Sequence, residues 1–390
     1  MIHTLALANY RSIRDLRVEL SQLNLVTGAN GCGKSNLYRG LRLLCDVAHG
    51  SATLALAREG GLTSVLWAGP ETLSGAMKRG EQPVQGGPRV NEVALRLGFV
   101  TDSFGYAVDF GLPLPVPRTL FGKDPEIKRE AIWHGDSWNA RRSLIDRFGP
   151  LVRARDEAGS WQVVEQHLPA FDSMLTQVAD PSLTPEVVAL RDELRAWRFY
   201  DHFRCDHDSP ARRAQIGVRT PVLSNDGHDL AAAWQTVNEI GDGEALARSV
   251  DDAFPGATVQ VATSDGRFEL LFEQPGLLRP LSQAELSDGT LRYLLLIAAL
   301  ATPRPPPIMV LNEPEMSLHP DLLAPLGRLM LRYAEAHPLW VVSHSPGLQN
   351  ELLSNSRTHH IELVKELGET RVANQGVLDA PAWTWPKRKL

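Results

Sequence analysis

The spacing of apolar residues changes along the chain, and each change predicts a different kind of structure. Residues 5–8, 16–20 and 23–27 are short apolar runs, which are typical of β-strands. Residues 36–45, which follow a glycine-rich turn, are compatible with a helix. We therefore predict that the chain begins as an α/β structure.

In the middle of the chain, apolar and polar residues recur with different periods. Residues 90–99 and 106–110 alternate apolar and polar positions, which predicts an antiparallel sheet. From residue 126 to 200 the pattern is mostly helical, with interruptions at prolines. We therefore predict an inserted helical lobe, residues 116–219. Its core is expected to hold Trp133, Trp138, Trp161 and Trp197.

Alternating helices and strands return after Gly227. The continuous apolar run 308–311 predicts a strand that is covered on both faces of a parallel sheet. The other predicted elements are helices at 229–240, 290–301 and 321–336, a hairpin of 258–262 with 268–272, and a strand at 339–342. The expected parts are thus 1–115, the lobe 116–219, and 220–390.

Composition and charge exclude several classes of protein. The chain has 390 residues, of which 43% are hydrophobic and 22% charged, as in globular proteins of two or three lobes. A net charge of −6 does not indicate a nucleic-acid binder, so any such contact must be local. We find neither a signal peptide nor a membrane span, and the three cysteines have no paired spacing. A cytoplasmic protein with reduced thiols is expected.

A phosphate-binding loop is the clearest chemical motif. GANGCGKS, residues 28–35, fits G-x-x-x-x-G-K-[ST] between a predicted strand and a predicted helix. Lys34 would reach the β- and γ-phosphates, and Ser35 would ligate Mg²⁺. The helix N-terminus would add partial positive charge. The residues expected to contact the nucleotide here are Asn30, Gly31, Cys32, Gly33, Lys34, Ser35 and Asn36.

Three later motifs narrow the kind of ATPase. They are LSDGT at 286–290, IMVLNEPEMSLHP at 308–320 and VVSHSP at 341–346. In order and spacing they resemble the signature, Walker B and switch-histidine motifs of ABC-type ATPases. With NYRSI at 9–13, the chain resembles the RecF/SMC/OLD-like group, over roughly residues 1–50 and 220–350. The resemblance implies an α/β fold: a P-loop NTPase head of ABC type, with an antiparallel β subdomain and an inserted helical lobe.

The resemblance also implies roles for single residues. Glu313 would polarise the attacking water and His344 would bind the γ-phosphate, so both are candidate catalytic residues. Ser287 and Gly289 would close over the ATP of a second molecule, giving a homodimer on ATP. Purely structural roles are also possible: a salt-bridging Glu313, a His344 bonded to backbone, and a Ser287 that caps a helix.

Asn312 departs from the family pattern, in which an aspartate at this position orients Mg²⁺. An amide keeps an acceptor oxygen but lacks the charge that Mg²⁺ prefers. Two interpretations stay open. Either the protein is a slow ATPase that acts as a switch, or Ser35 and the phosphates supply enough of the metal shell.

Weaker patterns concern a Gln-loop residue, a metal site and a nuclease domain. The Gln-loop residue is expected between the phosphate loop and the signature, and Gln82, Gln85 and Gln162 are candidates. His202, Cys205 and His207 could supply three ligands to zinc, although the neighbouring aspartates are as consistent with a polar loop. Nothing after His344 resembles a nuclease domain, so we do not expect the chain to cut nucleic acid by itself.

The predicted function is that of an ATP- and Mg²⁺-dependent ATPase that dimerises on ATP. It would clamp or sense DNA in repair, or act in antiphage defence with a separately encoded effector. A nucleotide-gated scaffold with very slow hydrolysis is the alternative, which Asn312 slightly favours. The ATPase subunit of a membrane transporter is a third candidate, which NYRSI and the long insertion argue against.

Overall fold

Two compact units make up the chain in the computed structural model. The structure describes residues 1–71, 74–79, 81–82, 94–115, 117–178, 180–376 and 378–388. The first unit consists of Met1–Ser21, Gly28–Ala196 and Ile361–Leu390, and the second of Gln22–Thr27 and Trp197–His360. Neither unit is one continuous segment of chain.

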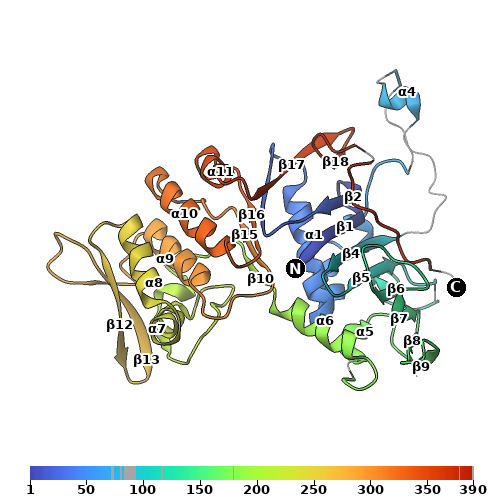
Figure 1. Ribbon diagram of the computed structural model, residues 1–390, viewed down its shortest axis with the longest axis horizontal. Helices are drawn as coiled ribbons and strands as arrows, with labels where there is room; N and C mark the ends of the chain where they lie inside the picture. Colours follow the sequence, from blue (N-terminus) through green and yellow to red (C-terminus); the bar gives the residue numbers. More distant parts are fainter. Residues whose placement is uncertain are drawn as a thin grey trace. The chain divides into compact units, whose positions relative to one another are not determined.

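An eight-stranded sheet dominates the first unit (Figure 1, blue to green). Every neighbouring pair of strands is antiparallel. In spatial order the strands are β2 (Ile13–Glu19), β1 (Ile2–Tyr10), β4 (Leu95–Thr101), β5 (Gly105–Gly111), β6 (Glu126–Trp133), β7 (Ser143–Phe148), β8 (Leu151–Arg155) and β9 (Trp161–Glu165). The predicted antiparallel sheet is confirmed where the structure describes it, while residues 90–93 lie outside the described residues.

Helices and a hairpin complete the first unit. The longest helix, α1, packs against β1 and α6. The helices are α1 (Lys34–His49), α2 (Ala52–Arg58), α3 (Leu62–Val65), α4 (Gly75–Lys78), α5 (Met174–Gln177) and α6 (Pro185–Ala196). The hairpin joins β17 (Thr358–Glu366) to β18 (Glu369–Val372), and the residues of β17 from Ile361 onward belong to this unit.

The prediction of helices from residue 126 onward is wrong for residues 126–165, which form the four strands β6 to β9. Charged residues at buried positions interrupt the alternation of apolar and polar residues by which a strand is predicted. Arg129 pairs with Asp146, and Arg147 pairs with Glu130 at 2.8 Å, with all four side chains nearly or fully buried. A pattern method counts these positions as exposed, because ionised side chains are rarely buried unless they are paired. Helix is confined to α5 and α6, and the boundaries 116–219 of the lobe remain a prediction.

Four parallel strands, which are part of a six-stranded sheet, form the centre of the second unit. In spatial order they are β10 (Arg198–Tyr200), β15 (Met309–Asn312), β16 (Leu339–Val342) and β3 (Leu23–Gly28). The residues of β15 and β16 are almost all buried, as predicted for strands with helices on both faces. Since parallel strands end at the same edge, the residues that follow β15, β16 and β3 leave the sheet on one side.

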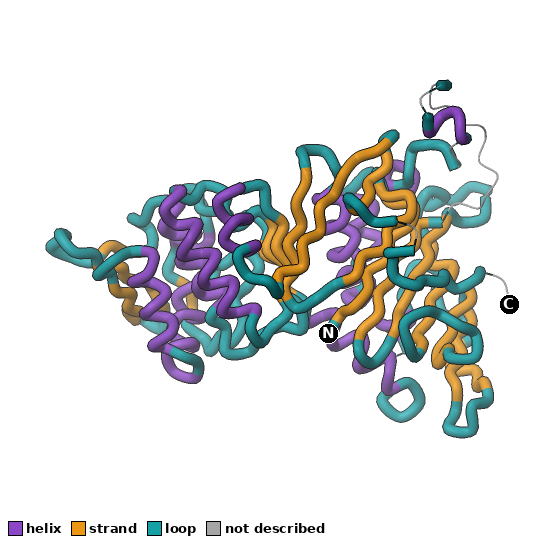
Figure 2. The backbone as a smooth tube through the Cα atoms, turned by 45° about the horizontal axis from the view of Figure 1, so that its top comes forward, coloured by secondary structure: helices purple, strands orange, loops and turns teal. Residues whose placement is uncertain are grey.

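Helices and a small sheet complete the second unit beside these strands (Figure 2). The helices are α7 (Leu230–Ile240), α8 (Gly243–Ala253), α9 (Asp288–Leu300), α10 (Leu323–Ala334) and α11 (Pro346–Leu353), with short 3₁₀ turns at Pro210–Arg212 and Pro320–Leu322. The small sheet contains β11 (Gln215–Ile216), β12 (Thr258–Ser264), β13 (Arg267–Glu273) and β14 (Leu281–Ser282). The predicted helices and hairpin of this region are confirmed.

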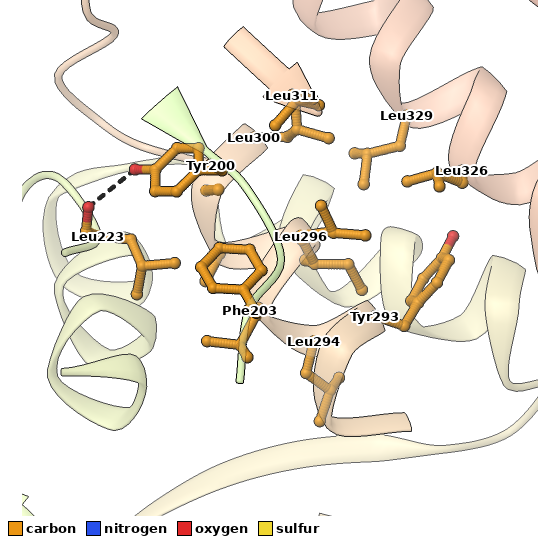
Figure 3. Packing of buried hydrophobic residues seen from close by; sticks show 14 of the residues in the cluster. Tyr200, Phe203, Leu223, Tyr293, Leu294, Leu296, Leu300, Leu311, Leu326 and Leu329 are labelled. Atoms are coloured by element: carbon orange, nitrogen blue, oxygen red, sulfur yellow. Dashed lines mark hydrogen bonds between the residues drawn. The ribbon is translucent and has the colours of Figure 1, made fainter. Parts of the chain in front are cut away.

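The core of the second unit lies around α9, where every residue from Leu291 to Leu300 is buried. Figure 3 shows Tyr200 and Phe203 packed among the leucines of α9 and α10. The Tyr200 hydroxyl donates a hydrogen bond of 2.8 Å to the Leu223 carbonyl, so this buried polar group is satisfied. This buried stretch begins directly after the LSDGT motif at the N-terminus of the helix.

The C-terminal residues lie on the first unit's sheet rather than free of it. Trp383 is buried against Gly98 and Trp133, and Arg388 pairs with Asp109 at 2.6 Å. Lys389 and Leu390 lie outside the described residues. In the described part of the chain, no helix has the length and apolar character to cross a membrane.

Candidate nucleotide site

The phosphate loop joins β3 to α1 through a backbone that requires glycine. Gly28 and Gly33 have φ values of 139° and 114°, which L side chains rarely adopt. A Cβ atom at Gly28 would lie 2.2 Å from the Leu363 carbonyl oxygen, and one at Gly33 would lie 2.1 Å from Thr370 Oγ1. Both glycines are therefore needed for conformation and for close packing.

Lys34 and Ser35 begin α1, and their side chains differ in exposure. Lys34 is buried, and its ammonium group donates to the carbonyls of Gly28 at 2.5 Å and Ala29 at 3.0 Å. Ser35 is exposed, as are Asn30 and Gly31 at the crest of the loop. A buried cation, exposed loop residues and the N-terminus of a helix form an anion-binding arrangement.

Cys32 is buried, in contrast to the exposed residues at the crest of this loop. Its side chain is 2% exposed, and Sγ lies 3.8 Å from the ammonium nitrogen of Lys34. The Asn36 side chain turns toward the neighbouring β1–β2 turn and donates to Ser12 Oγ at 2.7 Å. Among the predicted nucleotide contacts, Cys32 and Asn36 thus have side chains that bond within the protein.

The hydroxyl groups of Thr370 and Ser12 contact each other, and that of Thr370 contacts the phosphate loop. Thr370 Oγ1 on β18 donates to the Cys32 carbonyl at 2.7 Å and lies 2.6 Å from Ser12 Oγ. Thr370 is fully buried, and its backbone N–H also donates to the Ser12 carbonyl at 2.8 Å. Sequence reasoning missed Thr370 because nothing in its local sequence connects it with a loop at the other end of the chain.

The structure brings Glu313 and His344 together. Glu313 follows β15, and its backbone N–H donates to the Val342 carbonyl at 2.8 Å. Its carboxylate Oε1 lies 3.1 Å from Nε2 of His344, which follows β16, and both side chains are partly exposed. Glu313 also has a φ of +50°, a conformation that costs energy outside glycine and is common at functional sites.

Glu315 holds the backbone that carries His344. Its Oε1 accepts hydrogen bonds from Ser343 Oγ at 2.7 Å, from His344 N–H at 2.7 Å and from Ser345 N–H at 3.0 Å. A charged acceptor with three donors fixes this short segment more firmly than neutral hydrogen bonds would. We did not predict this role, although the second glutamate of the EPE sequence was visible.

Asn312 lies beside a carboxylate from the neighbouring strand. Tyr200 of β10 pairs with Leu311 of β15, so the next residues, Asp201 and Asn312, leave the sheet side by side. Asn312 Nδ2 donates to Asp201 Oδ1 at 3.3 Å. The sequence did not indicate Asp201, because only the strand order brings it to Asn312.

The LSDGT motif opens α9 as predicted. Ser287 is the N-cap, and its hydroxyl accepts from the Thr290 N–H at 3.1 Å. Ser287 and Asp288 are exposed, and Arg212 binds Asp288 at 2.6 Å and the Leu286 carbonyl at 2.7 Å. The helix-capping role considered for Ser287 is present, and a further role toward a second molecule stays a prediction.

The three candidate zinc ligands do not form a cluster. His202 lies against Arg292, whose Nη2 is within 3.0 Å of both ring nitrogens, and burial together with this cation lowers the pKa of His202. Cys205 is buried and its thiol pKa is raised by burial, whereas His207 is fully exposed. Over the described ranges, no group of three or more His, Cys, Asp or Glu side chains is arranged to bind a metal.

Two of the three candidate Gln-loop residues fall within the described part of the first unit. Gln162 is on β9 of the first unit's antiparallel sheet, Gln82 is exposed in a bend, and Gln85 lies outside the described residues. The strand next to β15 is β10, and it ends directly before Asp201. None of the three glutamines is therefore identified as the Gln-loop residue.

Solved structures that resemble this chain include three SMC head domains. One is titled as an SMC head bound to the C-terminal winged-helix domain of ScpA, with 12% identity, coverage of 97% of this chain and 98% of that one, and a TM-score of 0.49. The others are the SMC head domain from Thermotoga maritima (14%, 96% and 99%, TM-score 0.43) and an SMC head with an extended coiled coil, bound to the C-terminal domain of ScpA derived from Pyrococcus furiosus (12%, 95% and 95%, TM-score 0.47).

These structural resemblances are weak, and the family assignment rests on sequence. No curated protein is significantly similar to the chain. Residues 23–349, which include all four motifs, match the family described as "AAA domain, putative AbiEii toxin, Type IV TA system". Since this match spans most of the sequence, the chain belongs to the AAA_21 family of P-loop ATPase domains.

Proposed function

We propose that this protein binds Mg-ATP at the phosphate loop, hydrolyses it with Glu313 and His344, and closes as a homodimer on ATP. The contact between Glu313 and His344 at the end of two buried parallel strands is the observation that carries this proposal. Its position beside the strand that enters the phosphate loop supports the assignment, because β16 pairs with β3. Nucleotide sites of open parallel sheets lie at this edge.

The residues proposed for Mg²⁺ suit a hard cation. Ser35 offers an exposed hydroxyl and Asn312 an amide oxygen, and Mg²⁺ takes oxygen ligands, often few from protein and the rest from phosphates and water. When bound, the ion would neutralise charge on the phosphates. The other steps, which are phosphate binding and activation of water, would be carried out by side chains of the protein.

Each of these side chains has a distinct part in the proposed reaction. Lys34 would pair with the β- and γ-phosphate oxygens, since its ammonium group lies within the loop. Glu313 would orient the attacking water and accept its proton. His344 would donate a hydrogen bond to the γ-phosphate, and Glu315 would keep its backbone in place for this.

We further propose that Ser287 and Gly289 bind the ATP held by a second copy of the chain. Two observations support this: both lie at the N-terminus of α9, where Ser287 is exposed, and a helix N-terminus favours an anion such as phosphate. The closed dimer would then contain two ATP molecules, each bound by both copies.

In the cell, the ATPase cycle would serve antiphage defence with a separately encoded effector, or DNA maintenance. The family description, with its toxin–antitoxin system, supports the first use. A nucleotide-gated scaffold that hydrolyses ATP very slowly is a second candidate, and the neutral Asn312 at the metal position is the observation that favours it. ATPase rates measured with and without DNA ends would separate a DNA-stimulated ATPase from this scaffold.

Two variants test the proposed chemistry. Lys34→Ala should abolish ATP binding in calorimetry, because it removes the cation that would pair with the phosphates. Glu313→Gln should bind ATP normally and lose about 100-fold or more in turnover, the scale of a positioned base. Unchanged affinity in the first variant, or an unchanged rate in the second, would refute the respective role.

A further inference from the structure

We propose that Asp201 supplies the carboxylate that the Walker B strand lacks at Asn312, and that it helps to hold the Mg²⁺ of the bound nucleotide. This inference rests on the proposed function and adds a residue that the motifs do not contain. It starts from the sheet: β10 and β15 are parallel neighbours with Tyr200 opposite Leu311. Asp201 and Asn312 therefore emerge together at the edge where β3 enters the phosphate loop.

The two side chains are chemically complementary. Asn312 Nδ2 donates to Asp201 Oδ1 at 3.3 Å, so the amide and the carboxylate form one polar pair. Two carboxylates at this distance would repel each other and resist ionisation. An asparagine at position 312 is therefore compatible with an aspartate at position 201. The carboxylate that the family pattern has at the end of β15 is replaced in this chain by one at the end of the neighbouring strand, β10.

The acidic side chains that follow β15, the strand next to β10, contact residues 343–345. Glu313 contacts His344, and Glu315 accepts three hydrogen bonds from residues 343–345. His202, which follows Asp201, is directed to Arg292. Mg²⁺ at a nucleotide usually takes one or two carboxylates, and Asp201 presents one directly beside Asn312.

The test measures how much Mg²⁺ strengthens nucleotide binding, and it requires no turnover. Calorimetry would determine the affinity for the non-hydrolysable analogue AMPPNP in the full chain, once with Mg²⁺ and once with EDTA. In Asp201→Asn, the ratio of the two affinities should fall by about tenfold or more, the scale of losing a supporting metal-site group. The affinity in EDTA should not fall.

Two further variants make the result specific. Asp201→Asn/Asn312→Asp keeps an amide–carboxylate pair with its members exchanged, so it should fold and recover the ratio. Asp265→Asn is the matched control, since this exposed aspartate lies in the turn between β12 and β13 of the same unit, and its ratio should not change. Thermal unfolding curves would verify that each variant is folded.

The outcomes separate this inference from the proposed function. If AMPPNP binds to neither the Mg²⁺ nor the EDTA form of the unmodified protein, the proposed function itself fails. If the unmodified protein shows a Mg²⁺-dependent gain and Asp201→Asn retains it, the inference fails while the proposed function stands. A double variant that folds but does not recover the ratio would also overturn the inference.

Discussion

Replacing Glu315 with alanine is expected to release the segment that carries His344. The carboxylate accepts three hydrogen bonds, from the Ser343 hydroxyl and from the backbone N–H groups of His344 and Ser345. Ser343 is fully buried, so its hydroxyl would lose its partner without access to water, whereas the His344 backbone lies at an exposed position and can be hydrated. We therefore expect a local loss of about 2 kcal/mol, less than three full bonds to a charged acceptor.

Hydrogen exchange measures this loss where it occurs. A change of about 2 kcal/mol corresponds to roughly 30-fold faster exchange of the amides of His344 and Ser345, if they exchange by local opening. Mass spectrometry of a peptide covering residues 339–350 would detect it. Glu239→Ala is the control, because this exposed glutamate near the end of α7 contacts Arg219 and Gln235 and not residues 343–345. Unchanged exchange at these amides in a folded Glu315→Ala protein would refute the assigned role.

Two other predictions follow from the site. Thr370→Val keeps the shape of the side chain but removes its hydrogen bonds to Cys32 and Ser12. The free energy of unfolding measured with urea should therefore fall by about 2 kcal/mol, and ATP should bind more weakly. Thr263→Val, at an exposed position of β12, is the control and should change neither quantity. Ser287→Arg should leave ATP binding by the monomer intact but prevent the ATP-dependent dimer in light scattering. Ser264→Arg, at the exposed end of β12, is its control, and a dimer of normal stability in Ser287→Arg would contradict the proposed interface.

The sequence predicted those parts of the site that are continuous in the chain. The phosphate loop, the strand before Asn312 and the helix after Ser287 each combine a motif with a clear hydrophobic pattern, and the structure has all three elements. Asp201 and Thr370 could not be predicted in this way. Their partners lie more than a hundred positions away, and only strand pairing brings them together.

The strands from residue 126 to 165 were missed for a different physical reason. Pattern analysis treats a charged side chain as a surface residue, but Arg147 and Glu130 neutralise each other inside the first unit. Tyr106 and Ser173 also donate to the Glu130 carboxylate, so a buried polar network replaces part of an apolar core. Such a network is specified by its partners and not by local periodicity.

The position of β3 in the second unit has a consequence for synthesis on the ribosome. Leu23 pairs with Leu339, so the strand that pairs with β3 is synthesised roughly 300 residues after it. At about 5–20 residues per second this delay is about 15–60 s. During that time the apolar run Leu23–Gly28 has no sheet to join. Nascent chains should therefore depend on a chaperone until β16 emerges, and substitutions that make this run more polar should reduce that dependence at the expense of the finished sheet.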